Sequence, residues 1–368
     1  MRRRLALRGA LAALAAATAL GLAGCANLGY YWQSASGHVR VMNAARPVSD
    51  WLVDPQADER LKRQLQSAQR IRAFASRVLH LPDNPSYTRY ADLRRSAVLW
   101  NVVAAPPLSL TLRTWCVPVA GCVGYRGYYE EARAQAEADL LRAQGLDVAV
   151  YPVPAYSTLG WMNWAGGDPL LNTFIRYPEG ELARLVFHEL AHQVVYVKDD
   201  TAFNESFATA VERLGVRQWL DTEANEVASR EYEQVRARRE QFHALTRATR
   251  EQLASAYAAG ARAPSAPDTE ALLARKQAIL QDFRERYARL RATWPGDPAR
   301  WRSTDRWVEQ ANNAAFGAEA AYDEWVPAFE ALFEREGRDW RRFYDAVRQL
   351  ADLPRPQREQ RLKELSRA

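Results

Sequence analysis

The pentapeptide His188–His192 constrains the fold of this 368-residue chain more than any other segment. It has the pattern H-E-x-x-H, in which Glu189 directly follows the first histidine. Because positions i and i+4 share one face of a helix, both imidazoles can bind a single metal ion. The alternative is a core helix whose histidines only satisfy local hydrogen bonds, but paired imidazoles around a carboxylate fill a core poorly. The pattern therefore predicts a zinc-binding helix, and apolar residues at helical spacing favour its burial: Leu182, Leu185, Val186, Leu190, Val194 and Val195.

A catalytic zinc site needs a third protein ligand. Val195 and Lys198 stand where the metzincin pattern has Gly and His, so that class is excluded. Asn204–Ala208 matches the N-E-x-x-A form of Glu-zincins, and Glu205 is the predicted third ligand. Its alternative role is a carboxylate that favours a helix start. Glu212, two helical turns further on, is the second choice of ligand or a group that orients a ligating histidine.

The first 24 residues have the features of an export signal. Four arginines precede an Ala/Leu-rich run over 11–22, which is too short for a membrane-spanning helix. The run ends in Leu22-Ala23-Gly24-Cys25, which resembles the lipobox of bacterial lipoproteins. The resemblance implies that residues 1–24 are removed and that Cys25 carries a lipid anchor. It implies a location in the cell envelope, at the outer membrane and facing the periplasm. An ordinary secretory signal with an incidental cysteine is the alternative.

The charge of the predicted mature chain indicates no nucleic-acid partner. The formal net charge is +6, but residues 1–24 carry four arginines and no acid, so 46 basic residues face 44 acidic ones beyond them. The sequence has no basic stripe with interleaved aromatic residues. In the stretches 230–252 and 283–302, arginines alternate with acidic residues, which predicts a solvated helix face.

Cys116 and Cys122 flank a short turn-like run, and an extracytoplasmic location permits disulfides. We expect a disulfide that closes this loop, with two free thiols as the alternative. Two cysteines with this spacing are a weak zinc site.

The chain beyond the signal divides into four predicted parts. Residues 25–55 are a lipid anchor and an irregular, aromatic-rich tether, and 56–220 form a zincin-like catalytic core. Residues 221–300 are a helical hairpin insertion, which is structural or else a lid or partner-binding arm. Residues 301–368 are a helical region that completes the core. The predicted fold class is α+β, mostly helical, with a small β-sheet, a zincin-like metallopeptidase core and a long helical hairpin.

Within the core, periodicity predicts helices over 58–79 and 129–144. It predicts strands over 97–103, 108–115 and 147–153, and the strict alternation of 108–115 favours one exposed face.

The segment 157–161 lies between the last of these strands and the zinc helix. In zincins an edge strand at this place pairs with an extended peptide substrate. A structural β-turn is the alternative interpretation.

Several segments together resemble the bacterial putative aminopeptidase family, over about residues 40–365. The segments are 115–128, 155–161, 187–193, 203–212, 312–314 with Tyr322, and 326–329. The resemblance implies a zinc peptidase acting on peptide substrates, and members similarly begin with lipoprotein-like signals. Val123-Gly124 departs from the family pattern, in which we expect Pro at position 124.

The predicted reaction is zinc-dependent peptide hydrolysis. Glu189 is the predicted general base, and it moves a proton from water to the leaving amine. A tetrahedral oxyanion needs a further donor, for which Tyr322 is the prediction and Tyr156 and Asn312 are the alternatives. The predicted Zn²⁺ ligands are His188, His192 and Glu205.

These residues do not decide between an exopeptidase and an endopeptidase. An aminopeptidase needs a polar group for the substrate's α-amine, and no segment like G-A-M-E-N supplies one. The alternative function is a non-catalytic, zinc-binding envelope lipoprotein that binds a protein partner. An intact Glu189 argues against it, because a purely structural zinc site has no use for a base.

Overall fold

The computed structural model describes residues 28–117, 121–155, 157–261, 268–320 and 324–367. Helices make up most of this part of the chain, and three small sheets lie among them. The prediction of an α+β, mostly helical fold is confirmed. Among the helices of these described ranges, none is long and apolar enough to cross a lipid bilayer.

The best-formed sheet is antiparallel and has the strand order β6-β3-β7. Strands β3 and β7 confirm the strands predicted over 97–103 and 147–153. Helix α4 confirms the predicted helix over 129–144 and packs on one face of the sheet, while α10 packs on the other. The bounds are Leu99–Ala105 for β3, Arg126–Tyr128 for β6, Asp147–Val153 for β7, Glu131–Ala143 for α4 and Asn313–Ala320 for α10.

The strand predicted over 108–115 is wrong. Only Trp115 belongs to a strand, the short β4 (Trp115–Val117). Leu110 and Leu112 instead lie against α10, since a Cβ on Gly317 of that helix would lie 2.5 Å from the carbonyl oxygen of Leu110 and 2.9 Å from Cδ2 of Leu112. Apolar alternation here reflects the packing of leucines on α10 and the sheet, and not a pleated ladder.

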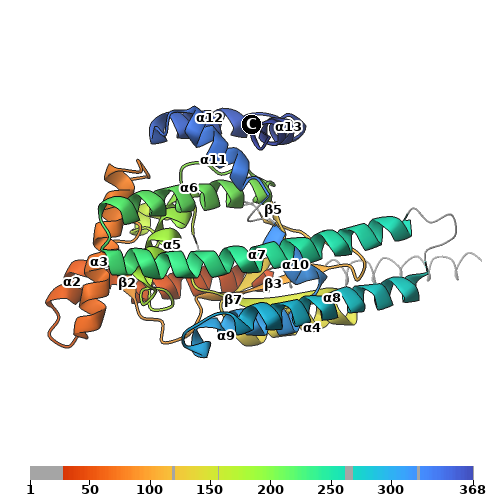
Figure 1. The fold of residues 1–368 in the computed structure, drawn as a ribbon. Coiled ribbons are helices and arrows are strands. Elements are labelled where there is room, and N and C mark those ends of the chain that lie inside the picture. Colours follow the sequence, from red (N-terminus) through yellow and green to blue (C-terminus); the bar gives the residue numbers. More distant parts are fainter. Residues whose placement is uncertain (1–27, 118–120, 156, 262–267, 321–323, 368) are drawn as a thin grey trace, which may run out of the picture.

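The main hydrophobic core lies around helices α3, α5 and α6, with α11, α12 and α13 packed beside α6 (Figure 1). Aromatic rings join these layers, since Phe207 of α6 contacts Phe329 of α11 and Phe343 of α12. Helix α3 confirms the predicted helix over 58–79. The bounds are Glu59–Arg77 (α3), Glu179–Ala191 (α5), Thr201–Thr222 (α6), Val326–Arg335 (α11), Trp340–Ala351 (α12) and Arg355–Leu365 (α13).

Two further small sheets lie outside the β6-β3-β7 sheet. One has the order β1-β2-β8, and the other is the hairpin of β4 and β5. Their remaining bounds are Arg46–Pro47 (β1), Arg89–Ala91 (β2), Leu170–Leu171 (β8) and Gly121–Val123 (β5).

The segment before the core is more ordered than predicted. Residues 28–44 are helical and α2 (Val48–Val53) follows, so the prediction of an irregular segment over 26–55 is wrong for these residues. The buried face of the helix includes Gln33 and Gly37, which an apolar periodicity does not detect. Gln33 accepts the N–H of Tyr129 at 3.2 Å, and Gly37 lies against the ring of that tyrosine.

The charged region after α6 forms two long helices, α7 (Glu226–Ala261) and α8 (Thr269–Ala292), which lie side by side in Figure 1. They share a hydrophobic cluster with α9 (Arg302–Gln310) and α10. Lys276 of α8 is buried and attaches this hairpin to the sheet, because its ammonium contacts Asp147 at 2.5 Å. A short 3-10 turn, η2 (Pro298–Trp301), connects α8 to α9.

The segment 157–161 contains no strand among its described residues. It is a turn that leads into the 3-10 helix η1 (Asn163–Ala165), with Leu159 and Gly160 at positive φ. The expected edge strand is therefore not at 157–161, and the β-turn interpretation agrees with the structure. Strand β7 is one of the two edge strands of the β6-β3-β7 sheet.

Candidate metal centre

Residues near the start of each helix fix where α5 and α6 begin, and one side chain fixes the loop between them. Glu179 and Glu181 lie in the first turn of α5, where carboxylates favour a helix N-terminus. Asp200 caps α6 by accepting the N–H of Phe203 at 3.2 Å. The side chain of Asn204 bonds both the N–H and the carbonyl of Val197 at 2.7 Å, which fixes the loop between the helices.

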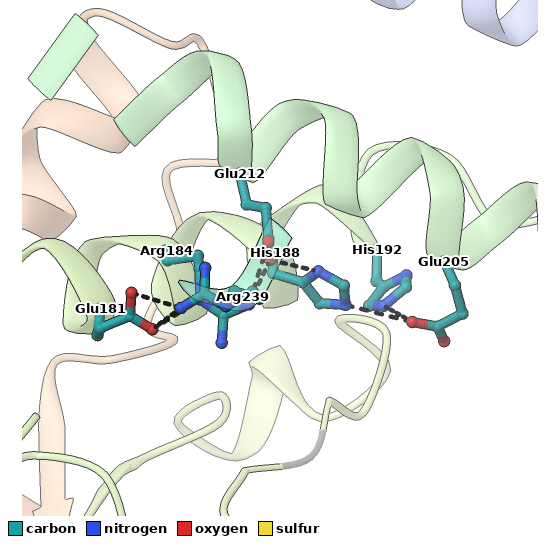
Figure 2. Close-up of polar contacts among 7 residues, drawn as sticks. All are labelled: Glu181, Arg184, His188, His192, Glu205, Glu212 and Arg239. Atoms are coloured by element: carbon teal, nitrogen blue, oxygen red, sulfur yellow. Dashed lines mark hydrogen bonds and ion pairs between the residues drawn. The ribbon is translucent and has the colours of Figure 1, made fainter. Parts of the chain in front are cut away.

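His188, His192 and Glu205 converge where α5 ends and α6 begins (Figure 2). One ligand atom from each residue lies within 4.8 Å of the others. The Glu205 carboxylate is 3.3 Å from Nε2 of His188 and 3.7 Å from Nε2 of His192. His192 is the C-cap of α5 but keeps helical dihedral angles, so the i, i+4 relation holds. Two imidazole nitrogens and one carboxylate oxygen are a donor set that fits Zn²⁺.

The electrostatics of the cluster favour a cation. Burial opposes the charged imidazole of His188, but Glu205 and Glu212 raise its pKa to about 10. Burial likewise opposes ionisation of Glu205, yet His192 and His188 hold its pKa well below the usual range. The carboxylates thus stabilise positive charge among the ligand atoms, as a metal ion requires.

Glu212 lies behind His188 and not among the converging ligand atoms. Its Oε2 is 3.0 Å from Nδ1 of His188, so the carboxylate orients the ring with Nε2 toward the cluster. Arg184 donates to both oxygens of Glu212 at 3.0 and 3.1 Å. Of the two roles predicted for Glu212, this geometry favours orientation over direct ligation.

Glu189 lies on α5 and directly follows His188 in the sequence. Burial raises the pKa of its carboxyl, and the opposing attraction of His188 and His192 does not cancel this rise. A carboxylate with a raised pKa is a stronger base, which suits proton transfer.

Tyrosines near the cluster were missed by the sequence analysis. Burial, followed by weaker repulsion from Glu205, raises the pKa of Tyr151 in β7 to about 12. The same two causes raise the pKa of Tyr125, which follows β5; protein surrounds its hydroxyl group although 38% of the residue is exposed to solvent. Both hydroxyls are therefore within electrostatic reach of a predicted ligand. No sequence signal pointed to Tyr125. The structure brings its segment toward the cluster, because Cys122 of the preceding strand donates its N–H to Asp199 Oδ1 in the α5–α6 loop at 2.5 Å.

Of the predicted oxyanion donors, the structure describes only Asn312, and it does not bring that residue to the cluster. Asn312 donates from Nδ2 to the carbonyl of Val148 at 3.0 Å, and its Oδ1 accepts N–H groups at the start of α10. Its amide is therefore used in capping and in binding the sheet edge, not as an oxyanion donor. Tyr322, Tyr156 and the lipidation site Cys25 lie outside the described residues.

Cys116 and Cys122 are joined by a disulfide at paired positions of β4 and β5. The bridge holds the hairpin that contacts the α5–α6 loop, so it belongs to the surroundings of the cluster.

A family model described as putative aminopeptidase matches residues 29–362. The chain belongs to this family. The match includes α5, α6 and the helical hairpin α7–α8, so the hairpin lies within the region that the family model describes. No curated protein and no solved structure shows significant similarity to the chain.

Membership of the putative aminopeptidase family supports a peptidase. The donor set that α5 and α6 bring together is the structural feature consistent with that activity.

Proposed function

We propose that the chain is a zinc-dependent peptidase of the cell envelope with a zincin-like core, attached to the outer membrane through a lipid on Cys25 and facing the periplasm. The single observation that carries the proposal is the convergence of His188, His192 and Glu205, with Glu189 adjacent in sequence. Zn²⁺ held by these ligands supplies Lewis acidity and lowers the pKa of water.

The protein's own residues supply the proton transfers. Glu189 takes a proton from the attacking water and later gives it to the leaving amine. Glu212 keeps the Nδ1 side of His188 occupied, so Nε2 is available as a ligand atom. Tyr125 or Tyr151, and not Asn312, would donate to the developing oxyanion, since both hydroxyls lie near Glu205.

An extended peptide would bind along the edge of β7. The carbonyl of Val148 accepts from Asn312 and so points away from β3. Because strand positions alternate, the backbone groups of Val150 also face the edge that points away from β3. Tyr151 is the next residue of β7 and lies near Glu205. A peptide paired with this edge would therefore run close to the cluster.

The test is cleavage of a peptide library by the purified full chain. We expect cleavage that a chelator abolishes and that added Zn²⁺ restores. Mapping the cut sites separates removal of N-terminal residues from internal cleavage. Zinc binding with no cleavage of any peptide would overturn the proposal in favour of a non-catalytic, partner-binding lipoprotein.

A further inference from the structure

A chain of four charged side chains connects α7 to the candidate metal centre (Figure 2). Arg239 of α7 donates to both oxygens of Glu181 at 2.6 Å. Arg184 donates from Nε to Glu181 at 3.1 Å and from Nη1 to Glu212 at 3.0 and 3.1 Å. Glu212 contacts Nδ1 of His188 at 3.0 Å. A predicted zinc ligand is thus connected to a helix of the hairpin.

The chain is more shielded from solvent than the ion pairs that Arg236 makes on α7. The side chains of Glu212 and Glu181 are 6% and 12% exposed, and that of Arg239 is 27% exposed. Arg236, one turn earlier, pairs with Glu233 and Glu240 of its own helix at 43% exposure. Shielded charges depend on their partners far more than surface charges do.

Because the charges alternate along the chain, Arg239 affects how firmly Glu212 holds His188. Glu181 is shared by two arginines, and Arg184 is shared by two carboxylates. If Arg239 is lost, Glu181 retains Arg184 as the cation of this chain and draws it away from Glu212. Glu212 is then held less firmly against His188. Groups that orient a ligating histidine typically change metal affinity by about 10-fold to 100-fold when they are lost.

We propose that Arg239 is a positioning residue through which the hairpin α7–α8 sets the metal affinity of the centre. The inference rests on the proposed function, because it takes His188 to be a zinc ligand. A change in the packing of α7 on α5 is then transmitted to the ligand set.

The experiment measures zinc affinity of the full chain by competition with a chelator, together with the visible absorption of the Co²⁺-substituted protein. Arg239→Met is expected to weaken zinc binding by about tenfold and to change the Co²⁺ spectrum. Arg236→Met, the matched control on the same helix, is expected to change the affinity by less than about twofold. Adding Glu181→Gln to Arg239→Met frees Arg184 for Glu212 and is expected to restore most of the affinity.

Arg239→Lys keeps the charge without the forked geometry and is expected to give an intermediate loss, so the test holds even if Arg239→Met does not fold. Wild-type zinc affinity and an unchanged Co²⁺ spectrum in both arginine variants would overturn the inference. Failure of the wild-type chain to bind zinc would instead overturn the proposed function, so the two failures are distinguishable.

A second, independent observation concerns the helix over 28–44, which leaves an apolar stripe in solvent. Leu28, Tyr31, Trp32 and Val39 are 69%, 42%, 73% and 53% exposed. Their spacing places them along one face of the helix, opposite the face that packs on the protein. Exposed tryptophan and tyrosine on an amphipathic helix are typical of a membrane interface.

We infer that this stripe rests on the lipid bilayer. The inference rests on the proposed lipid anchor, because Cys25 is three residues before Leu28 and its lipid would hold the helix at the membrane surface. A single acyl chain binds weakly, so a second membrane contact strengthens attachment.

The test uses the chain from Ala26 onward, which contains every described residue but no lipid. We expect it to bind vesicles of phosphatidylethanolamine and phosphatidylglycerol, with a blue shift of tryptophan fluorescence. Trp32→Ser is expected to weaken binding by at least about tenfold, from the apolar surface removed. Trp164→Ser is the matched control, because Trp164 is 84% exposed in η1. Equal effects of the two variants, no vesicle binding, or self-association through Trp32 would overturn the inference.

Discussion

Replacing Glu212 with glutamine removes a carboxylate that contacts both Arg184 and His188. Burial opposes ionisation of this group, but Arg184 and His188 lower its pKa from 4.5 to about 2. At about 1.4 kcal/mol per pH unit, a pKa lowered by about 2.5 corresponds to about 3 kcal/mol of stability. Because the folded pKa is the lower one, this stability is present above about pH 4.5 and is lost as the pH falls toward 2.

The assay is urea unfolding of the metal-free full chain. Glu212→Gln should lose about 3 kcal/mol at about pH 7 and roughly half of that at about pH 3. Glu330→Gln is the matched control, because Glu330 pairs with Arg217 near the surface and should lose less than about 1 kcal/mol. An equal loss for Glu212→Gln at both pH values would show that packing and not charge holds this group, and would refute the reasoning.

Three further changes test other parts of the structure. Arg358→Met should lower the free energy of unfolding by about 3–5 kcal/mol, because it leaves the buried α6 cap Asp200 without the guanidinium that contacts it at 2.7 Å; urea unfolding measures this. Burial raises the pKa of Asp168 from 3.8 to about 6, so the wild type should lose about 3 kcal/mol of stability as the pH rises from about 4 to above 6. Asp168→Asn should remove that pH dependence, and a parallel loss in both proteins would contradict it. Replacing Cys116 and Cys122 together with serine should cost about 2 kcal/mol by the loop-closure model, and reductant should abolish the difference in thermal unfolding.

Much of the candidate site was predictable because its signals are local. His188 and His192 are one helical turn apart, and Glu205 follows after a short loop, so few conformations are open to the three side chains. Asn204, the first residue of the matched N-E-x-x-A pattern, bonds the loop that brings Glu205 to the histidines.

The parts that were missed depend on contacts distant in sequence or on atypical residues. Arg239 lies in a stretch where alternating charges predict a solvated face, yet it reaches Glu181, 58 residues earlier. The helix over 28–44 was missed because Gln33 and Gly37 occupy its buried face. The leucines of 108–115 alternate as in a strand, but Leu110 packs against a cluster of helices, since periodicity does not identify the partner of an apolar residue.

The measurement that tests the central claim most directly compares the wild-type chain with Glu189→Gln, recording zinc content and peptide cleavage on the same samples. Wild type should bind one zinc ion and cleave peptides. The variant should keep the zinc, because its ligands are intact, and should lose activity by about 10²-fold to 10⁴-fold, the usual contribution of a general base. Wild-type cleavage by a zinc-loaded Glu189→Gln protein would contradict the account.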